Sequence, residues 1–164
     1  MSDEKLIKVL LVDDEVKLLE SVSQRLSLRD FEVTTATDGK KAIKAAKGDK
    51  FDVAVVDLRM PGMDGTEVLK TLKKRHKWLE VIILTGYGSI DSAAECTRLG
   101  AFGYLEKPAD FDKLIDVLKQ AYTERLKKKF KRDQKRMEDI EFLSMGASPM
   151  SILASLRRLD DDEK

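Results

Sequence analysis

The stretch that most constrains the fold is residues 51–65, FDVAVVDLRMPGMDG, in which a short apolar run stops abruptly at a carboxylate. Residues 53–56 are apolar and mostly β-branched, a pattern that indicates a strand buried on both faces of a sheet. Asp57 follows directly, and a proline and two glycines then force a loop. On its own, such an acid would simply end a strand or cap a helix. In an open α/β sheet, however, this edge is where ligands and reacting groups collect.

The rest of the chain alternates apolar strand patterns with helical stripes. Strands are predicted at residues 6–12, 31–36, 53–56, 81–84 and 102–105, and helices at about 15–28, 41–47, 66–76, 89–99 and from Asp110 onward. Five strands alternating with five helices describe a doubly wound α/β fold, and right-handed crossovers favour the flavodoxin-like strand order 2-1-3-4-5. The sequence therefore predicts a doubly wound five-stranded parallel sheet with a long C-terminal helical extension.

This strand order brings acidic residues together at one edge of the sheet. The first and third strands become neighbours, and their carboxyl ends carry Asp13, Asp14 and Asp57. Three converging carboxylates repel one another, so a compensating charge is needed. Mg²⁺ prefers oxygen ligands and needs only one or two direct carboxylates. We therefore expect a Mg²⁺ site here rather than three separate solvated acids.

Two further strand ends supply a hydroxyl and an ammonium group. The fourth strand ends at Thr85, and the fifth leads into Lys107, which precedes a proline. A lysine in this position could be an ordinary surface group, but it lies at the same edge as the acids. Together these groups suit a site that receives a phosphoryl group, with Asp57 as the nucleophile. The metal and Lys107 would neutralise the phosphoryl oxygens, and Thr85 would donate a hydrogen bond.

The motifs that carry these residues resemble a known family. VDDE, VVDLRMPGMDG, ILTGYGS and GAFGYLEKP occur in order over roughly residues 5–123. This pattern resembles the receiver domain of bacterial two-component response regulators. It is closest to the receivers attached to enhancer-binding transcription activators, whose AAA+ and DNA-binding domains have no counterpart in these motifs.

The resemblance implies a role for each site residue. Asp57 would be the phosphoacceptor, and Asp13 and Asp14 would hold Mg²⁺ with Asp57. The backbone carbonyl of Arg59 would be a further metal ligand. Tyr87, like Arg59, lies two residues beyond a site residue, at positions that in this family modulate the lifetime of the phosphoryl group.

The resemblance also implies a mechanism of signalling. Lys107 would bind the phosphate, and Thr85 and Tyr104 would form a switch pair that reshapes the face of the fourth helix, fifth strand and fifth helix. A sensor histidine kinase or a phosphotransfer protein would present the phosphohistidine. The chain would thus be a phospho-accepting response regulator of a phosphorelay, a signalling domain rather than an enzyme acting on another substrate.

The C-terminal part lies beyond the motifs. No proline or glycine interrupts the pattern from Asp110 to about Leu143, which predicts a helix about 50 Å long. Residues 125–136 are strongly basic, and the sign of the charge reverses after Met137. We divide the chain into a receiver domain, 1–123, and a charged helical extension, 124–164, without a recognised effector domain. A short amphipathic helix is expected at residues 152–159.

The extension is expected to make the protein associate, most simply as a homodimer through the last helix and residues 124–144. One alternative is a receiver-regulated nucleic-acid binder that uses the basic segment 125–136. The charge reversal and the lack of a fold for base readout weigh against it. A receiver that pairs without being phosphorylated is a second alternative, against which the intact acidic trio argues.

Composition places the chain in a cellular setting. The net charge is +1, and the single cysteine, Cys96, cannot form an internal disulfide. The polar N-terminus lacks an apolar signal core, and no apolar run reaches the length of a membrane span. We expect a cytoplasmic protein without a membrane partner. The only histidine, His76, lies in a basic helix end and is expected to be a surface group.

Overall fold

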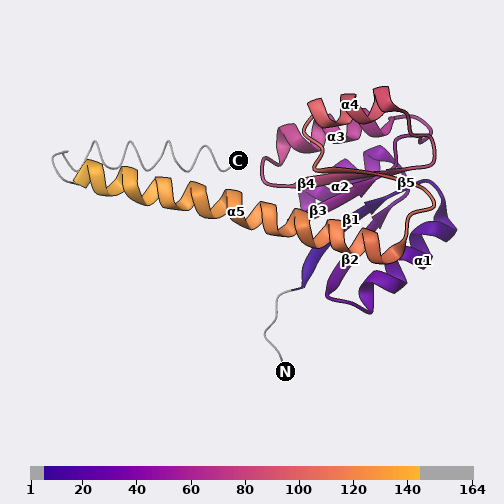
Figure 1. The fold of residues 1–164 in the computed structure, drawn as a ribbon, viewed down its shortest axis with the longest axis horizontal. Helices are drawn as coiled ribbons and strands as arrows, with labels where there is room; N and C mark the ends of the chain where they lie inside the picture. The colour runs from indigo at the N-terminus through magenta and orange to yellow at the C-terminus, as the bar shows by residue number, and fades with distance from the viewer. Residues whose placement is uncertain (1–5, 145–164) are drawn as a thin grey trace.

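The computed structural model describes residues 6–144, within which the chain forms a sheet covered by helices (Figure 1). The strands are β1 (Ile7–Val12), β2 (Phe31–Ala36), β3 (Val53–Val56), β4 (Glu80–Thr85) and β5 (Gly103–Glu106). The helices are α1 (Val16–Ser27), α2 (Gly39–Gly48), α3 (Gly65–Arg75), α4 (Ile90–Arg98) and α5 (Phe111–Ser144). All paired strands are parallel, in the order β2-β1-β3-β4-β5, which confirms the predicted fold class.

The sheet is buried on both faces because alternate strand side chains point to opposite sides. On one face, α2, α3 and α4 pack through side chains that include Ala42, Leu69 and Cys96. On the other face, α1 and α5 pack through residues such as Leu19 and Leu118. Figure 1 shows α3 and α4 on one side of the sheet and α5 on the other. This arrangement explains why β3 is a continuous apolar run with every side chain buried.

The loop from β3 to α3 is held close to the end of the strand. The backbone N–H of Gly65 donates to the Leu58 carbonyl at 2.7 Å. A Cβ atom at residue 65 would lie 2.2 Å from the Asp57 carbonyl oxygen and 2.5 Å from the Leu58 Cα. Only glycine therefore allows this approach. Asp64 then caps α3, since its carboxylate accepts from the N–H groups of Thr66 and Glu67.

We expect Gly65→Ala to lower the free energy of unfolding by about 1–3 kcal/mol, because the new methyl group must displace backbone atoms rather than a flexible side chain. Gly48→Ala is the matched control: a Cβ there meets nothing within 4 Å, so helix α2 should be unchanged or slightly stabilised. Urea denaturation of the two variants measures the difference. Equal stabilities would show that the loop can move away without cost.

Helix α5 has 34 residues, a length of about 51 Å, as predicted. Its first turns pack on the sheet, and the remainder projects well beyond the domain (Figure 1). The predicted helix at residues 152–159 lies outside the described residues. Within residues 6–144, no helix combines the length and the apolar character needed to cross a membrane.

Two ion pairs fix α5 to the amino edge of the sheet. Arg125 is buried, and its Nε donates to Asp52 Oδ1 at 3.0 Å, while its Nη1 donates to the Trp78 carbonyl at 2.7 Å. One turn later, Lys128 Nζ lies 2.8 Å from Oε1 of the buried Glu80. The helix thus remains in contact with the domain past residue 123, where the extension was predicted to begin.

Candidate functional site

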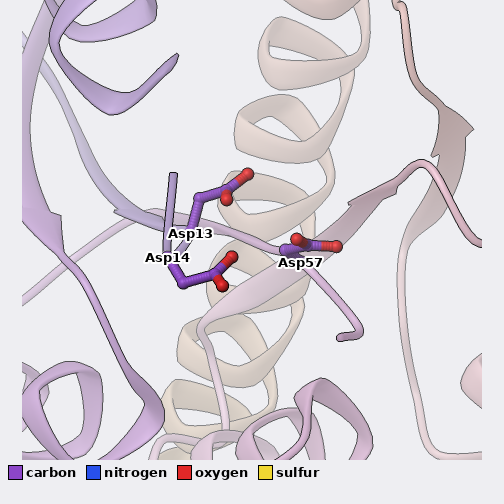
Figure 2. A group of neighbouring side chains, drawn as sticks. All are labelled: Asp13, Asp14 and Asp57. Atoms are coloured by element: carbon purple, nitrogen blue, oxygen red, sulfur yellow. The ribbon is translucent and has the colours of Figure 1, made fainter. Parts of the chain in front are cut away.

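The acidic cluster follows directly from the register of β1 and β3. Val12 is paired with Val56, so Asp13 and Asp57 leave the sheet side by side, and the Asp57 N–H donates to the Val12 carbonyl at 3.0 Å. One carboxylate oxygen from each of Asp13, Asp14 and Asp57 lies within 4.8 Å of the others (Figure 2). Asp13 and Asp57 are buried, whereas Asp14 is exposed. The predicted convergence of these three acids is therefore present.

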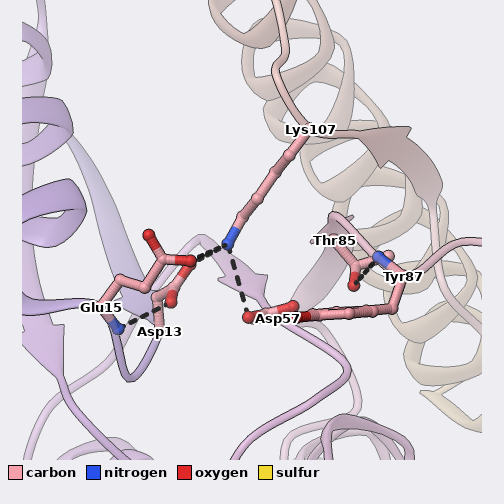
Figure 3. Close-up of polar contacts among 6 residues, drawn as sticks. All are labelled: Asp13, Glu15, Asp57, Thr85, Tyr87 and Lys107. Atoms are coloured by element: carbon pink, nitrogen blue, oxygen red, sulfur yellow. Dashed lines mark hydrogen bonds and ion pairs between the residues drawn. The ribbon is translucent and has the colours of Figure 1, made fainter.

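Lys107 reaches the acids from the end of β5. Its Nζ lies 2.5 Å from Asp13 Oδ2, 3.4 Å from Asp57 Oδ2 and 3.9 Å from Glu15 Oε1 (Figure 3). Its backbone N–H donates to the Thr85 carbonyl at 2.9 Å, and its peptide bond to Pro108 is cis. Burial by itself lowers the pKa of Lys107, but the hydrogen bond and charge of Asp13, with the charges of Asp57 and Glu15, outweigh it and raise the pKa. The ammonium group is therefore a permanent positive charge.

The arrangement suits a divalent cation. Asp57 Oδ1 is buried and has no hydrogen-bond partner among the described residues, although a buried carboxylate oxygen normally has one. Lys107 brings one positive charge to three clustered carboxylates, which leaves the site negative. Carboxylate oxygens are the ligands that Mg²⁺ prefers, so the donor set fits this ion. A role for the Arg59 carbonyl stays a prediction.

Thr85 lies at the neighbouring strand end and is fully buried. Its Oγ1 accepts a hydrogen bond from the Tyr87 N–H at 3.2 Å (Figure 3). Because that bond uses a lone pair of the oxygen, the hydroxyl hydrogen is still available to donate. An open cavity of about 660 Å³ lies over this edge, and Asp57, Arg59 and Tyr87 are among its lining residues.

Two contacts beside the site were not predicted from the sequence. The Arg59 guanidinium lies over the Tyr87 ring, 4.5 Å from its centroid, so these two side chains meet at the cavity. The half-buried Tyr104 hydroxyl lies 2.9 Å from Ser92 Oγ. Ser92 also completes the capping box of α4 with Ser89, so the predicted switch tyrosine is tied to the start of that helix. The Ser-x-x-Ser spacing was the only sequence signal for this contact.

His76 is not the surface group that the sequence suggested. It is half-buried at the end of α3, and its Nε2 is buried without a partner among the described residues. Burial, followed by the charge of Arg75, lowers the pKa of this histidine. His76 precedes β4, so it lies at the amino edge of the sheet. The three acids follow β1 and β3 and lie at the opposite, carboxyl edge.

Comparison with known proteins gives a family for this chain. The response regulator receiver domain family matches residues 9–119. The chain is 39% identical over 114 residues to the C4-dicarboxylate transport transcriptional regulatory protein DctD of Pseudomonas aeruginosa, covering 70% of this chain and 25% of that protein. It is 36% identical over 113 residues to the DNA-binding transcriptional regulator NtrC of Escherichia coli, covering 69% of this chain and 24% of that protein. The chain thus spans about a quarter of the length of these relatives.

Solved structures agree with this result. A CheY-like response regulator receiver domain protein from Methanospirillum hungatei superposes with a TM-score of 0.73 at 29% identity, covering 75% of this chain and 98% of that one. NtrX from Brucella abortus gives a TM-score of 0.72 at 32% identity, covering 77% of this chain and 30% of that one. In both fold and sequence, the chain belongs to the receiver domain family of two-component response regulators.

Proposed function

We propose that Asp57 is the phosphoacceptor and that it takes a phosphoryl group from a phosphohistidine presented by a sensor histidine kinase or a phosphotransfer protein. The observation that carries this proposal is the position of its carboxylate. Oδ2 faces the Lys107 ammonium, Oδ1 is buried without a partner among residues 6–144, and the residue opens onto a cavity. A carboxylate with one oxygen held and one unsatisfied is placed to react.

The transfer can be written with the groups at this edge. A carboxylate oxygen of Asp57 attacks phosphorus, the P–N bond of the donor breaks, and its electron pair stays on the imidazole ring. Lys107, already in contact with Asp57, balances negative charge on the phosphoryl oxygens. The Thr85 hydroxyl donates to one of them, since its bond from Tyr87 leaves the hydrogen free. Mg²⁺ held by Asp13, Asp14 and Asp57 would supply further positive charge.

The same groups suggest how the signal leaves the site. When Thr85 moves towards the phosphoryl group, it vacates space beside β5, and Tyr104 can turn into that space. Turning would break the contact between Tyr104 and Ser92 and release the start of α4. The face of α4, β5 and α5 would change shape, and a partner would recognise it.

Labelling the full chain with a small-molecule phosphodonor tests this function without a cognate kinase. An acid- and base-labile acyl phosphate should form only with Mg²⁺ present. Reduction of the acyl phosphate with borohydride should then mark residue 57 by mass spectrometry. A label on serine, threonine or histidine, or one independent of Mg²⁺, would rule out the proposal.

Asp14→Asn tests the metal ligands. We expect Mg²⁺ affinity to fall at least about tenfold and labelling to slow with it, because one of the three acids is lost. Thermal stability without metal should rise, because repulsion within the cluster decreases. Calorimetric titration and thermal melts measure both effects. Asp116→Asn, an exposed acid on α5, should change neither, and unchanged Mg²⁺ affinity in Asp14→Asn would contradict the assignment.

We also propose that residues 1–123 act as the receiver unit, that residues 124–164 form an extension, and that the protein forms a homodimer through α5. Leu126, Phe130 and Met137 are 48%, 68% and 71% exposed. At about 100° per residue they fall within about 40° of one another on the helix. The three side chains therefore form an apolar stripe along one side of α5, as a two-fold pairing of helices requires.

The charges of α5 favour this proposal over nucleic-acid binding by residues 125–136. Arg125 and Lys128 already pair with Asp52 and Glu80, so the segment offers fewer free cations than its composition suggests. The relatives that are named as DNA-binding or transcriptional regulators are about four times as long as the matched region. We place the protein in the cytoplasm, where the buried, free Cys96 would stay reduced.

A further inference from the structure

A second cavity lies at the opposite edge of the sheet from the acids. It has a volume of about 320 Å³ and lies between α5 and the segments that lead into β3 and β4, near Phe51 and Leu79. Its lining includes six strongly basic side chains: Lys50, Arg75, Lys77, Arg125, Lys129 and Arg132. This site could not be predicted from the sequence, because its basic residues come from three separate segments.

The positive charge of this cavity is not balanced by its own walls. Asp49 is the only acidic side chain among the described lining residues, and its carboxylate lies 2.5 Å from Lys8 Nζ. Lys50, Arg75 and Lys129 form no ion pair with any residue in the range 6–144. A solvated helix face usually intersperses both signs of charge, so this concentration of one sign is unusual.

The concentration of positive charge affects the pKa of Lys129. Burial lowers the pKa of its ammonium group, and the charges of Arg125, Arg132 and Lys50 lower it further. The four cations therefore repel one another, and Asp52 beside Arg125 and Asp133 beside Arg132 offset only part of this repulsion. An anion entering the cavity would relieve this repulsion, in addition to its direct attraction to each side chain.

Two of the cations are held in place by the fold. Arg125 donates to Asp52 and to the Trp78 carbonyl. The Arg132 guanidinium lies over the Trp78 ring, 5.1 Å from its centroid. These contacts fix α5 against the loop before β4, so that a ligand would meet basic groups that are already positioned.

We propose that this cavity binds a small ligand that carries a chain of phosphate groups. Arginine and lysine are the side chains suited to phosphate oxygens, and the volume is in the range of small-molecule sites. A helix or strand of another protein would need a longer groove. An adjoining cavity of about 500 Å³ shares Lys77, Trp78 and Arg132, and it offers room for the remainder of a larger molecule such as a nucleoside.

Calorimetric titration of the full chain with sodium tripolyphosphate tests this proposal. The buffer should contain a chelator, because without a divalent cation the carboxyl edge is acidic and repels phosphate. We expect saturable binding, and we expect Lys50→Gln/Lys129→Gln to weaken it at least about tenfold. The phosphate chain could belong to a nucleotide or be an inorganic polyphosphate, and titration with ATP distinguishes these two ligands. Tighter binding of ATP than of tripolyphosphate indicates a nucleotide, and equal or weaker binding indicates an inorganic phosphate chain.

The matched control is Lys113→Gln/Lys119→Gln, which removes the same charge from exposed positions on α5 outside both cavities. Its affinity for tripolyphosphate should equal that of the unmodified protein. The Lys50→Gln/Lys129→Gln variant should be at least as stable in urea as the unmodified protein, because like charges are removed. Lost binding then cannot be attributed to unfolding. No saturable binding, or equal weakening in both variants, would overturn the proposal. Stronger binding of a single-stranded oligonucleotide that is unchanged in the cavity variant would do the same.

Discussion

Asp57→Asn is expected to abolish acyl-phosphate formation completely while the domain stays folded. Asparagine has the same shape as aspartate, and it removes a buried negative charge from a cluster of three. Its amide nitrogen is not nucleophilic, and its oxygen is far less so than a carboxylate. Phosphodonor labelling followed by intact-mass analysis measures the result.

Asp64→Asn is the matched control for this experiment. Asp64 lies on the same loop, lines the same cavity and caps α3. Asparagine caps a helix as well as aspartate does, so labelling should be retained at full stoichiometry. A stoichiometric label on the Asp57→Asn variant that has not moved to another acid would show that Asp57 is not the acceptor.

The second large effect is expected on association. Replacing Leu126, Phe130 and Met137 together with glutamine should raise the dimer dissociation constant at least about a hundredfold. Each exposed apolar side chain contributes on the order of 1.5–3 kcal/mol when it is buried, and a two-fold interface buries each of them twice. Sedimentation velocity over a range of protein concentrations measures the dissociation constant.

These substitutions are a sharper test than deleting the extension. A chain ending at Tyr122 lacks Arg125 and Lys128, so it leaves the buried Glu80 without its partner and loses stability for a separate reason. Phe142→Gln is the control: this residue is 78% exposed but lies on a different side of the helix from the stripe. A monomeric unmodified protein, or a dimer that the triple variant leaves intact, would contradict the proposal.

The strands and the acidic cluster could be predicted because their signals are local. A run such as residues 53–56 marks a doubly buried strand by itself. Once the strand order is assumed, Asp13 and Asp57 must leave the sheet at neighbouring positions. The position of Lys107 at the end of β5 follows from the same reasoning, and in the structure its Nζ contacts Asp13.

Contacts between distant segments could not be predicted in this way. Arg125 and Asp52 are 73 residues apart, and Lys128 and Glu80 are 48 apart, with nothing in the local pattern of either residue to indicate the other. The basic stretch 125–136 therefore suggested nucleic-acid binding as one alternative, although part of it holds α5 to the domain. The burial of His76 has the same origin, because the end of α3 lies against residues that are remote in sequence.

The anchoring of α5 at Arg125 and Lys128 gives its projecting part the geometry of a lever. From Lys128, which pairs with Glu80 of β4, to Ser144 the helix is about 24 Å long. A tilt of about 5° at the anchored end would therefore displace the far end by about 2 Å, which is the size of shift that repacks an interface between subunits. A rearrangement of α5 too small to alter the domain itself would be amplified at the end of the helix. A distance measured between paired labels near residue 140 in a dimer would therefore report on the state of the domain more sensitively than labels near Asp57.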